Sequence, residues 1–325
     1  MTQAVPGPGP QAPRGDGAAD VVCIASWNVD LVSRVPRPPA RGETLMADAF
    51  DISPGGKGSN AAVACARQGA HVALVARIGD DDFGRMGLAL WGGEGISARH
   101  VVTAPGERSG VAQIFIYPDG DNSIAVAPGA GAGLAAADVE AASATIAAAR
   151  VVIASCEVPF EATLAAFRIA RAHGVRTLFN PAPARALPAG LLALADVVTP
   201  NETELLALAG LEDGASPDAA AQALLARGVG AVVATLGSAG CRLWSADGAG
   251  HAVPGWRMAS VADTVGAGDT FTGALAAALA RGEPLPAAMA CANAAAALSV
   301  TAHGATTGMP TLASTRTLLA TRPSA

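Results

Sequence analysis

The chain has 325 residues, enough for one large α/β domain or two smaller ones. Its formal net charge of −6 and the lack of a basic stretch argue against a nucleic-acid partner. Aromatic residues make up only 4% of the chain, so we expect a core of Ala, Val, Leu and Ile, and no apolar run approaches the roughly 18 residues of a membrane helix.

The first 20 residues, MTQAVPGPGPQAPRGDGAAD, are rich in Pro, Gly and Ala and lack the order of a signal peptide. They are predicted to form a disordered leader over residues 1–20. The five cysteines are widely spaced and include no C-x-x-C pair. This pattern predicts reduced thiols and a cytoplasmic protein. The five histidines do not cluster at metal-ligand spacing, which argues against a zinc site.

From residue 21 onward, short apolar runs alternate with runs of helical character. In chain order the sequence predicts a strand at 21–26, a helix at 59–69, strands at 71–79 and 150–155, a helix at 159–174, strands at 175–179 and 195–200, helices at 201–210 and 217–228, and a strand at 229–237. Repeated strand–helix–strand units at this spacing predict right-handed crossovers and a mostly parallel sheet covered on both faces. The continuous apolar strands agree with burial on both sides.

Two segments interrupt this alternation, at residues 30–53 and 109–129. The second has two β-rich runs around PDGDN, which is typical of a hairpin. Together the two segments predict a small separate sheet. In an α/β enzyme such a sheet is a candidate lid; the alternative is a surface decoration without a role.

Polar residues follow several of the predicted strands, where open α/β sheets bind their ligands. Asn28 and Asp30 are two residues apart, so in an extended chain they point the same way. An amide beside a carboxylate suits the hydroxyls of a polyol, although an Asx-turn explains the pair equally well. Glu157 follows the strand at 150–155 and is either a ligand or a capping or surface glutamate.

The string PGGKGSN, residues 54–60, precedes a predicted helix. Its glycines allow backbone N–H groups to approach a ligand, and Lys57 and Asn60 add polar side chains. It is not a P-loop, because Asp51 stands where that motif needs a glycine and Gly58 where it needs Ser or Thr.

The string TPNETE, residues 199–204, also follows a strand. Asn201 is a candidate N-cap, and Glu204 three residues later completes a capping-box pattern. The functional alternative is that the two residues organise water around a phosphate-bound magnesium ion, which needs few direct protein ligands.

The string DTVGAGDTFTGAL, residues 263–275, is a turn into a helix. It is not a dinucleotide fingerprint, because Phe271 stands where a third glycine is needed. The free N–H groups of Gly266, Ala267 and Gly268 are expected to bind an anion at the helix N-terminus. Asp269 lies in the first turn beside them. An anion hole next to a carboxylate suits phosphoryl transfer, with the carboxylate as base.

Together these strings resemble the ribokinase family of carbohydrate kinases, also called the PfkB family. The resemblance rests on GGKGSN, GDDDFG, NPAPAR, TPNETE, TLGSAG and DTVGAGDTFTGAL, which occur in the family's order. It implies a ribokinase-like three-layer α/β sandwich with a mostly parallel central sheet and a small β-sheet lid. It places the kinase domain at residues 21–315, after the leader and before a tail at 316–325.

The resemblance also implies roles for matching residues. Asp269 is the catalytic base, and the N–H groups of residues 266–268 form the anion hole. The sugar-binding positions are Asn28, Asp30, Gly56, Lys57, Asn60, Glu157 and Asp269. The ATP site comprises Asn201, Thr235, Leu236, Gly237, Ser238, Ala239, Gly240, Gly268 and Asn293. An activating monovalent cation, usually K⁺, matches Asp263, Val265, Ser299, Ala302, Gly304 and Gly308, and Mg²⁺ is served through water by Asn201 and Glu204.

The implied reaction is transfer of the ATP γ-phosphoryl group to the 5-hydroxyl of D-ribose. Another family kinase acting on deoxyribose, another sugar or a nucleoside is the alternative, and a non-catalytic sugar-binding protein is a remote one. Two departures bear on specificity: PGAGAG at 128–133 replaces the family's PGAN, and no glutamine follows Asn60. Gly308 stands where ribokinases often have a serine. Because the family often pairs through its lids, a homodimer is expected.

Overall fold

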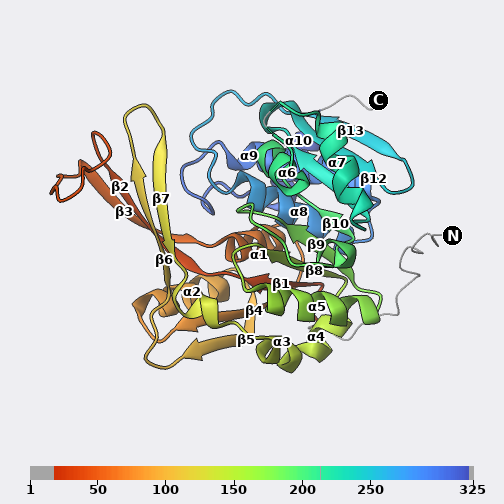
Figure 1. Cartoon of the computed structure of the whole chain (residues 1–325), viewed down its shortest axis with the longest axis horizontal. Coiled ribbons are helices and arrows are strands. Elements are labelled where there is room, and N and C mark those ends of the chain that lie inside the picture. Colours follow the sequence, from red (N-terminus) through yellow and green to blue (C-terminus); the bar gives the residue numbers. More distant parts are fainter. Residues whose placement is uncertain (1–17, 213, 322–325) are drawn as a thin grey trace.

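The computed structural model describes residues 18–212 and 214–321 of the chain. Within these ranges the main sheet has nine strands, and a smaller sheet stands out from the body at the upper left of Figure 1. In spatial order the main sheet contains β13 (Gly250–Pro254), β12 (Gly240–Ser245), β11 (Ala231–Thr235), β10 (Val197–Val198), β9 (Arg176–Asn180), β8 (Val151–Ser155), β1 (Val21–Ala25), β4 (Val72–Gly79) and β5 (Ser97–Ala104).

The pairing of these strands confirms the α/β prediction. Neighbouring strands from β5 across to β11 in this spatial order, which includes β4 and β1, pair in parallel. β12 and β13 continue the sheet as antiparallel strands. β1 lies between β8 and β4, so the order of the strands in the sheet reverses at β1. Such a switch point opens a crevice at the carboxyl ends of the strands, where ligands of open α/β sheets bind.

Helices cover both faces of the main sheet, which explains the unbroken apolar runs. Along β1, Val21, Cys23 and Ala25 pack into one hydrophobic core, and Val22 and Ile24 pack into the other. The first core is formed with α1 (Lys57–Arg67), α2 (Asp82–Gly93), α8 (Ala267–Ala280), α9 (Leu285–Ser299) and α10 (Leu312–Leu319). The second is formed with α3 (Ala136–Ala141), α4 (Ser143–Ala148), α5 (Phe160–Ala172), α6 (Glu202–Ala209) and α7 (Pro217–Ala226).

The small sheet is built from the two segments that interrupt the alternation. Within the described ranges it has four strands in the order β3 (Ala49–Gly55), β2 (Asn28–Arg34), β6 (Gly110–Ile116) and β7 (Asn122–Ala127). β2 pairs in parallel with β6, and the two outer pairs are antiparallel. The prediction of a separate sheet is confirmed. The sheet begins two residues earlier than the predicted segment 30–53, so Asn28 belongs to it.

The predicted strands and helices of the main domain are confirmed, with one reduced in length: the strand expected at 195–200 contains only β10. Residues 1–17 of the predicted leader and 322–325 of the predicted tail lie outside the described residues, and the predicted boundary at residue 315 falls within α10. All five cysteines are free and buried. Of the helices that the structure describes, none is both long and apolar enough to cross a membrane.

Candidate active site

The N-terminal ends of α1 and α8 meet beyond the carboxyl ends of β1 and β8. Ser26, which follows β1, receives the Gly58 N–H on its Oγ at 3.1 Å and the Ser59 N–H on its carbonyl at 3.1 Å. The two helices pack closely side by side because Gly273 has no side chain: a Cβ there would lie 2.3 Å from the Ala61 carbonyl oxygen. This packing brings two distant sequence motifs together.

Asp269 lies at the centre of this arrangement, in the first turn of α8, and is only 6% exposed. Its Oδ2 accepts a hydrogen bond of 2.9 Å from Asn60 Nδ2 on α1. Burial raises the pKa of Asp269 to about 6, against the lowering effects of Lys57 and of the Asn60 hydrogen bond, and the charges of Glu157 and Glu204 raise it further. A carboxylate with a pKa in this range is suited to accept a proton near neutral pH.

The amide oxygen of Asn60 is free to accept a hydrogen bond from a ligand. Asn60 Oδ1 is buried and makes no hydrogen bond to any described residue. A buried acceptor without a partner is costly, so a ligand hydroxyl that donates to it would be stabilised. Lys57 lies near the carboxylates of Asp269 and Glu157, and the charge of Asp269 is the main cause that raises the pKa of Lys57.

Asn28 and Asp30 enter the site from β2, on the same face of the small sheet. Two glycines make room for them: a Cβ at Gly110 would lie 2.3 Å from Asn28 Oδ1, and a Cβ at Gly55 would lie 2.2 Å from Asp30 Oδ1. Burial raises the pKa of Asp30 to about 7, and the charges of Glu157 and Asp269 add to this shift. Neither glycine can be recognised as a site residue from the sequence, because nothing in the local sequence shows which side chain it faces.

Glu157 is held at the N-terminus of α1. Its Oε2 accepts hydrogen bonds from Ser26 Oγ at 2.7 Å and from the Lys57 backbone N–H at 2.8 Å. The carboxylate therefore satisfies the first N–H group of α1 and lies at the positive end of that helix. The capping interpretation of Glu157 is thus correct as local structure, and its charge also acts on Asp30 and Asp269. Ser26 was not identified from the sequence.

Residues 266–268 form the turn into α8. Gly266 is the N-cap and has φ 77°, the left-handed region that favours glycine, while a side chain on Gly268 would have open space around it. Asp269 follows directly in the chain. The turn thus presents the N-terminus of a 14-residue helix beside a buried carboxylate, the combination that binds anions next to a base.

The motif around Asn201 lies beside the TLGSAG segment. Asn201 and Thr235 form a parallel β-bridge. Asn201 Oδ1 accepts a hydrogen bond of 2.8 Å from the Glu204 N–H, and Glu204 Oε2 accepts one of 2.9 Å from the Asn201 N–H. The predicted capping box is therefore confirmed. It holds Glu204 near enough for its charge to raise the pKa of both Asp269 and Lys57.

The rest of the predicted nucleotide site follows β11. Residues Gly237–Ala239 form a short 3-10 turn, closed by a hydrogen bond of 2.8 Å from the Leu236 N–H to the Gly240 carbonyl. On the neighbouring α9, Asn293 Nδ2 donates to the Pro254 carbonyl at 2.9 Å at the end of β13. The two elements frame the edge of the sheet next to Asn201.

The predicted cation residues come from two loops that the fold brings into contact. Asp263 Oδ1 accepts a hydrogen bond of 2.9 Å from the Val265 N–H, and its Oδ2 accepts one of 3.0 Å from the Gly304 N–H. The Ala262 N–H donates to the Val300 carbonyl at 2.8 Å. The first loop thus leads into α8, and the second follows α9.

Gly308 is required by the way the second loop folds back on α9. A Cβ at this position would lie 2.1 Å from the carbonyl oxygen of Ser299 and 3.4 Å from the Ala302 Cβ. The backbone therefore has no room for a side chain such as serine at this position. Ser299 Oγ also donates to the Ala296 carbonyl at 2.8 Å, so a cation here would depend on backbone oxygens.

The chain matches the model of the pfkB family carbohydrate kinases over residues 18–312. The chain belongs to the PfkB family of carbohydrate kinases. As a member, it is a phosphotransferase with a hydroxyl group as acceptor and ATP as co-substrate.

Individual relatives are similar over nearly the whole chain. Ribokinase from Haemophilus influenzae is 38% identical over 290 residues, which are 89% of this chain and 94% of that protein. Deoxyribokinase from Salmonella typhimurium is 35% identical over 296 residues, covering 90% and 96%. The chain spans 48% of a bifunctional ribokinase/ribose-5-phosphate isomerase A from Fructilactobacillus sanfranciscensis, with 39% identity over 259 residues, or 79% of this chain.

The fold is shared with solved ribokinases. The structure of Arabidopsis thaliana ribokinase complexed with ribose and ATP superposes with a TM-score of 0.86 and 30% identity, over 93% of this chain and 99% of that one. The ribokinase-like fold, with its main sheet and small separate sheet, is thereby confirmed.

Proposed function

We propose that this kinase is a ribokinase that transfers the γ-phosphoryl group of ATP to the 5-hydroxyl of D-ribose. The similarity to ribokinases over nearly full length supports ribose as acceptor. The observation that carries the proposal is the buried Asp269–Asn60 pair beside the N-terminus of α8. Deoxyribose is the second candidate, favoured by the 35% identity to a deoxyribokinase.

In this proposal the sugar lies between the small sheet and the ends of α1 and α8. Asn28 and Asp30 contact it from β2, and Asn60 Oδ1 accepts a hydrogen bond from one of its hydroxyls. Asp269 takes the proton of the attacking hydroxyl. The N–H groups of residues 266–268 stabilise the charge on the transferring phosphoryl oxygens, a preorganised arrangement that needs no movement at the moment of reaction.

We assign the nucleotide to the surface between Asn201, Asn293 and the TLGSAG segment, with its phosphates toward α8. Among the described residues, no group of three or more His, Cys, Asp or Glu is arranged to hold a metal ion. A magnesium ion that keeps most of its waters and binds nucleotide phosphates fits this donor set, with Asn201 and Glu204 contacting its water shell. When bound, Mg²⁺ would neutralise charge on the phosphates.

A monovalent cation, K⁺, is assigned to the two loops that meet at Asp263. The carbonyl groups of Val265, Ser299, Ala302, Gly304 and Gly308, with the Asp263 carboxylate nearby, would supply its oxygen ligands. Oxygen-only ligand sets suit hard cations. Such a cation would add positive charge next to the anion hole.

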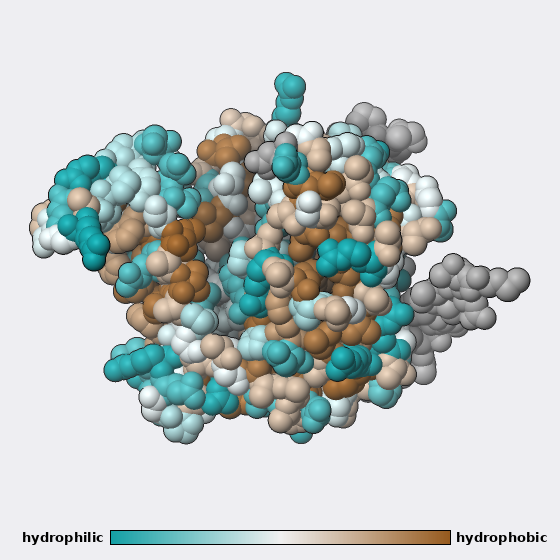
Figure 2. Space-filling model, in the orientation of Figure 1, coloured by the Kyte–Doolittle hydropathy of each residue, from teal (hydrophilic) through white to brown (hydrophobic). Residues whose placement is uncertain are grey.

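A homodimer that pairs the small sheets is also proposed. Large apolar side chains on the outer strands of this sheet are half exposed or more: Phe50 and Ile52 lie on one face, and Ile124 and Val126 lie on the other. Figure 2 shows hydrophobic surface over the middle of the sheet and hydrophilic residues at its tip. Ile124 and Val126, side by side on one face, offer an apolar contact surface to a second copy of the chain. Sedimentation velocity of an Ile124→Asp variant tests it: a shift to monomer supports the dimer, and an unchanged value opposes it.

The buried, reduced state of the five cysteines supports a cytoplasmic location.

The substrate assignment is tested by turnover of ribose, deoxyribose, fructose and adenosine with ATP and Mg²⁺, each with and without K⁺. We expect the highest kcat/KM for ribose. A higher kcat/KM for deoxyribose would show that the enzyme is a deoxyribokinase, and no turnover of any sugar would overturn both substrate assignments.

A further inference from the structure

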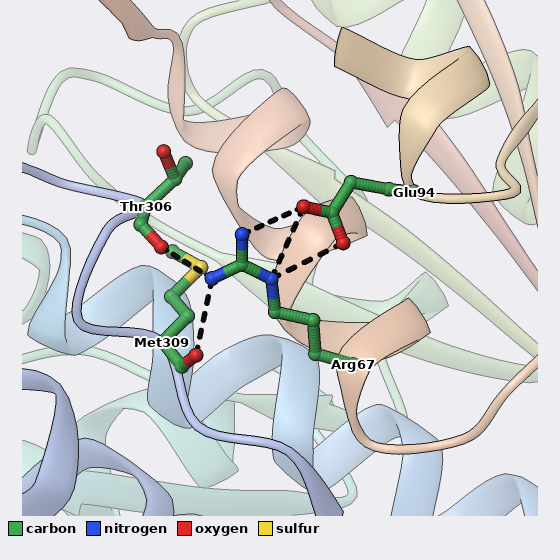
Figure 3. Close-up of polar contacts among 4 residues, drawn as sticks. All are labelled: Arg67, Glu94, Thr306 and Met309. Carbon is green, nitrogen blue, oxygen red and sulfur yellow. Dashed lines mark hydrogen bonds and ion pairs between the residues drawn. The ribbon is translucent and has the colours of Figure 1, made fainter.

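The last residue of α1, Arg67, links three separate parts of the chain (Figure 3). On one side its Nε and Nη2 donate to the carboxylate of Glu94, at the end of α2, with distances of 2.6 to 3.2 Å. On the other side its Nη1 donates to the carbonyls of Thr306 at 2.6 Å and Met309 at 3.1 Å. Each nitrogen of the guanidinium group therefore has a partner.

This geometry requires arginine. The planar guanidinium directs its N–H groups outward in a fixed fork, so one group can bind a carboxylate and two carbonyls at once. The ammonium group of a lysine is a point charge that cannot reach both sides. The Arg67 and Glu94 side chains are only 25% and 19% exposed, so their hydrogen bonds are partly shielded from water and are stronger than those of a surface pair.

The carbonyls that Arg67 binds belong to the α9–α10 loop, residues 300–311. This loop contains no helix or strand, so contacts with other parts of the chain must fix its shape. The Thr306 carbonyl also accepts a hydrogen bond from the Met309 N–H at 3.2 Å, which closes a turn. Arg67 binds this turn at both ends.

The same loop supports the N-terminus of α8. The backbone of Ala305 lies against Gly266, where an added Cβ would be 2.5 Å from the Ala305 carbonyl oxygen. The Gly304 N–H holds Asp263 by a hydrogen bond of 3.0 Å. A shift of the loop would therefore move the turn that presents the N–H groups next to Asp269.

We propose that Arg67, oriented by Glu94, is a positioning residue for the anion hole, acting through the α9–α10 loop. Helix α1 then serves the site at both ends: Asn60 in its first turn contacts Asp269, and Arg67 at its last residue fixes the loop behind Gly266. The kinetic part of this inference rests on the proposed function, and the structural part does not.

The test compares Arg67→Gln and Arg67→Lys with the control Arg281→Gln. Arg281, at the far end of α8, is a matched control because its side chain is also mostly buried, with 23% exposed. Like Arg67 it binds both a carboxylate, on Glu283, and a backbone carbonyl, on Gln68. Three quantities are measured for each protein: amide hydrogen exchange of residues 300–309 without ligands, the temperature of unfolding, and kcat and KM for sugar and ATP.

Arg67→Gln is expected to speed exchange of residues 300–309 and to lower kcat by about tenfold to a hundredfold, since displacements near 1 Å at a catalytic site have effects of this size. The KM for sugar should change little. Arg67→Lys retains the ion pair with Glu94, so it should recover thermal stability but neither loop protection nor kcat. Arg281→Gln should lose stability without either effect.

If Arg67→Gln and Arg281→Gln lose similar stability while exchange and kcat stay at wild-type values, Arg67 is only structural and the proposal is overturned. Full rescue by Arg67→Lys would overturn it as well. If Arg67→Gln does not fold, Arg67→Lys alone decides by the same two readouts. A wild-type enzyme without sugar kinase activity would refute the proposed function, and the exchange data would still test the loop.

Discussion

Replacing Asp269 with Asn is expected to make the protein more stable at neutral pH while it abolishes turnover. Asp269 is buried and forms no salt bridge with another described residue, and its pKa is raised from 3.8 to about 6. At about 1.4 kcal/mol per pKa unit, the ionised side chain costs about 3 kcal/mol of folding free energy at pH 8. This figure already includes the favourable effect of Lys57 on the ionised form. Asn mimics the protonated acid and removes the cost.

The pH dependence follows from the direction of the shift. Because the pKa is higher in the folded state, the wild type loses stability relative to Asp269→Asn as the pH rises from about 4 to about 6, and the difference stays constant above that range. Urea unfolding of both proteins between pH 4 and pH 8 measures it. The native state must be intact across this range, which circular dichroism verifies.

Asp81→Asn is the matched control with the opposite sign. Burial favours the neutral acid at Asp81, but hydrogen bonds from the Ser109 hydroxyl, the Ser109 N–H and the Gly84 N–H outweigh it and lower its pKa. Asp81→Asn should therefore be less stable than wild type at neutral pH, and the difference should shrink as the pH falls. If Asp269→Asn shows no gain in stability, or a gain that does not change with pH, then the pKa of Asp269 is not raised by burial as we infer.

Further predictions concern the site around this residue. Turnover should fall as the pH drops through about 6, because Asp269 must be ionised to act as a base; a flat kcat down to pH 5 would oppose this role. Gly110→Ala should raise the KM for sugar, because the added Cβ displaces the Asn28 side chain. Loss of one hydrogen bond between Asn28 and the sugar corresponds to about a tenfold increase, and an unchanged KM would place the sugar elsewhere. Gly308→Ser should lower the free energy of unfolding by more than about 1 kcal/mol through its clash with the Ser299 carbonyl, measured in urea, and equal stability would refute the tight loop. K⁺ should activate the enzyme more than Na⁺, and equal rates in both salts would argue against the cation site.

Much of the fold could be predicted because it depends on local patterns. Apolar runs such as residues 21–26 identify strands that are buried on both faces, and glycines such as Gly69 and Gly174 end the helices between them. The sequence pattern does not predict β12 and β13, although these strands extend the main sheet. The small sheet was predicted because two segments lacked helical character, but its strand order depends on pairing between distant segments.

The candidate site could be predicted where one short motif contains the reactive groups. It could not be predicted where the contacts join motifs that are distant in the sequence. Asp269 follows a glycine turn at the start of a helix, which indicates a base beside an anion hole from spacing alone. Gly110 makes room for Asn28, and Arg67 binds carbonyls 239 and 242 residues away. No local pattern marks those positions, because their role depends on the tertiary structure.

We propose Asp269 as the base of a ribose kinase whose other residues bind ribose and ATP without it. The most direct test measures ribose and ATP binding by calorimetry and turnover by product formation, in the wild type and in Asp269→Asn. We expect the variant to bind both substrates and to lose turnover by about three orders of magnitude or more. Near-normal turnover in Asp269→Asn would contradict this expectation.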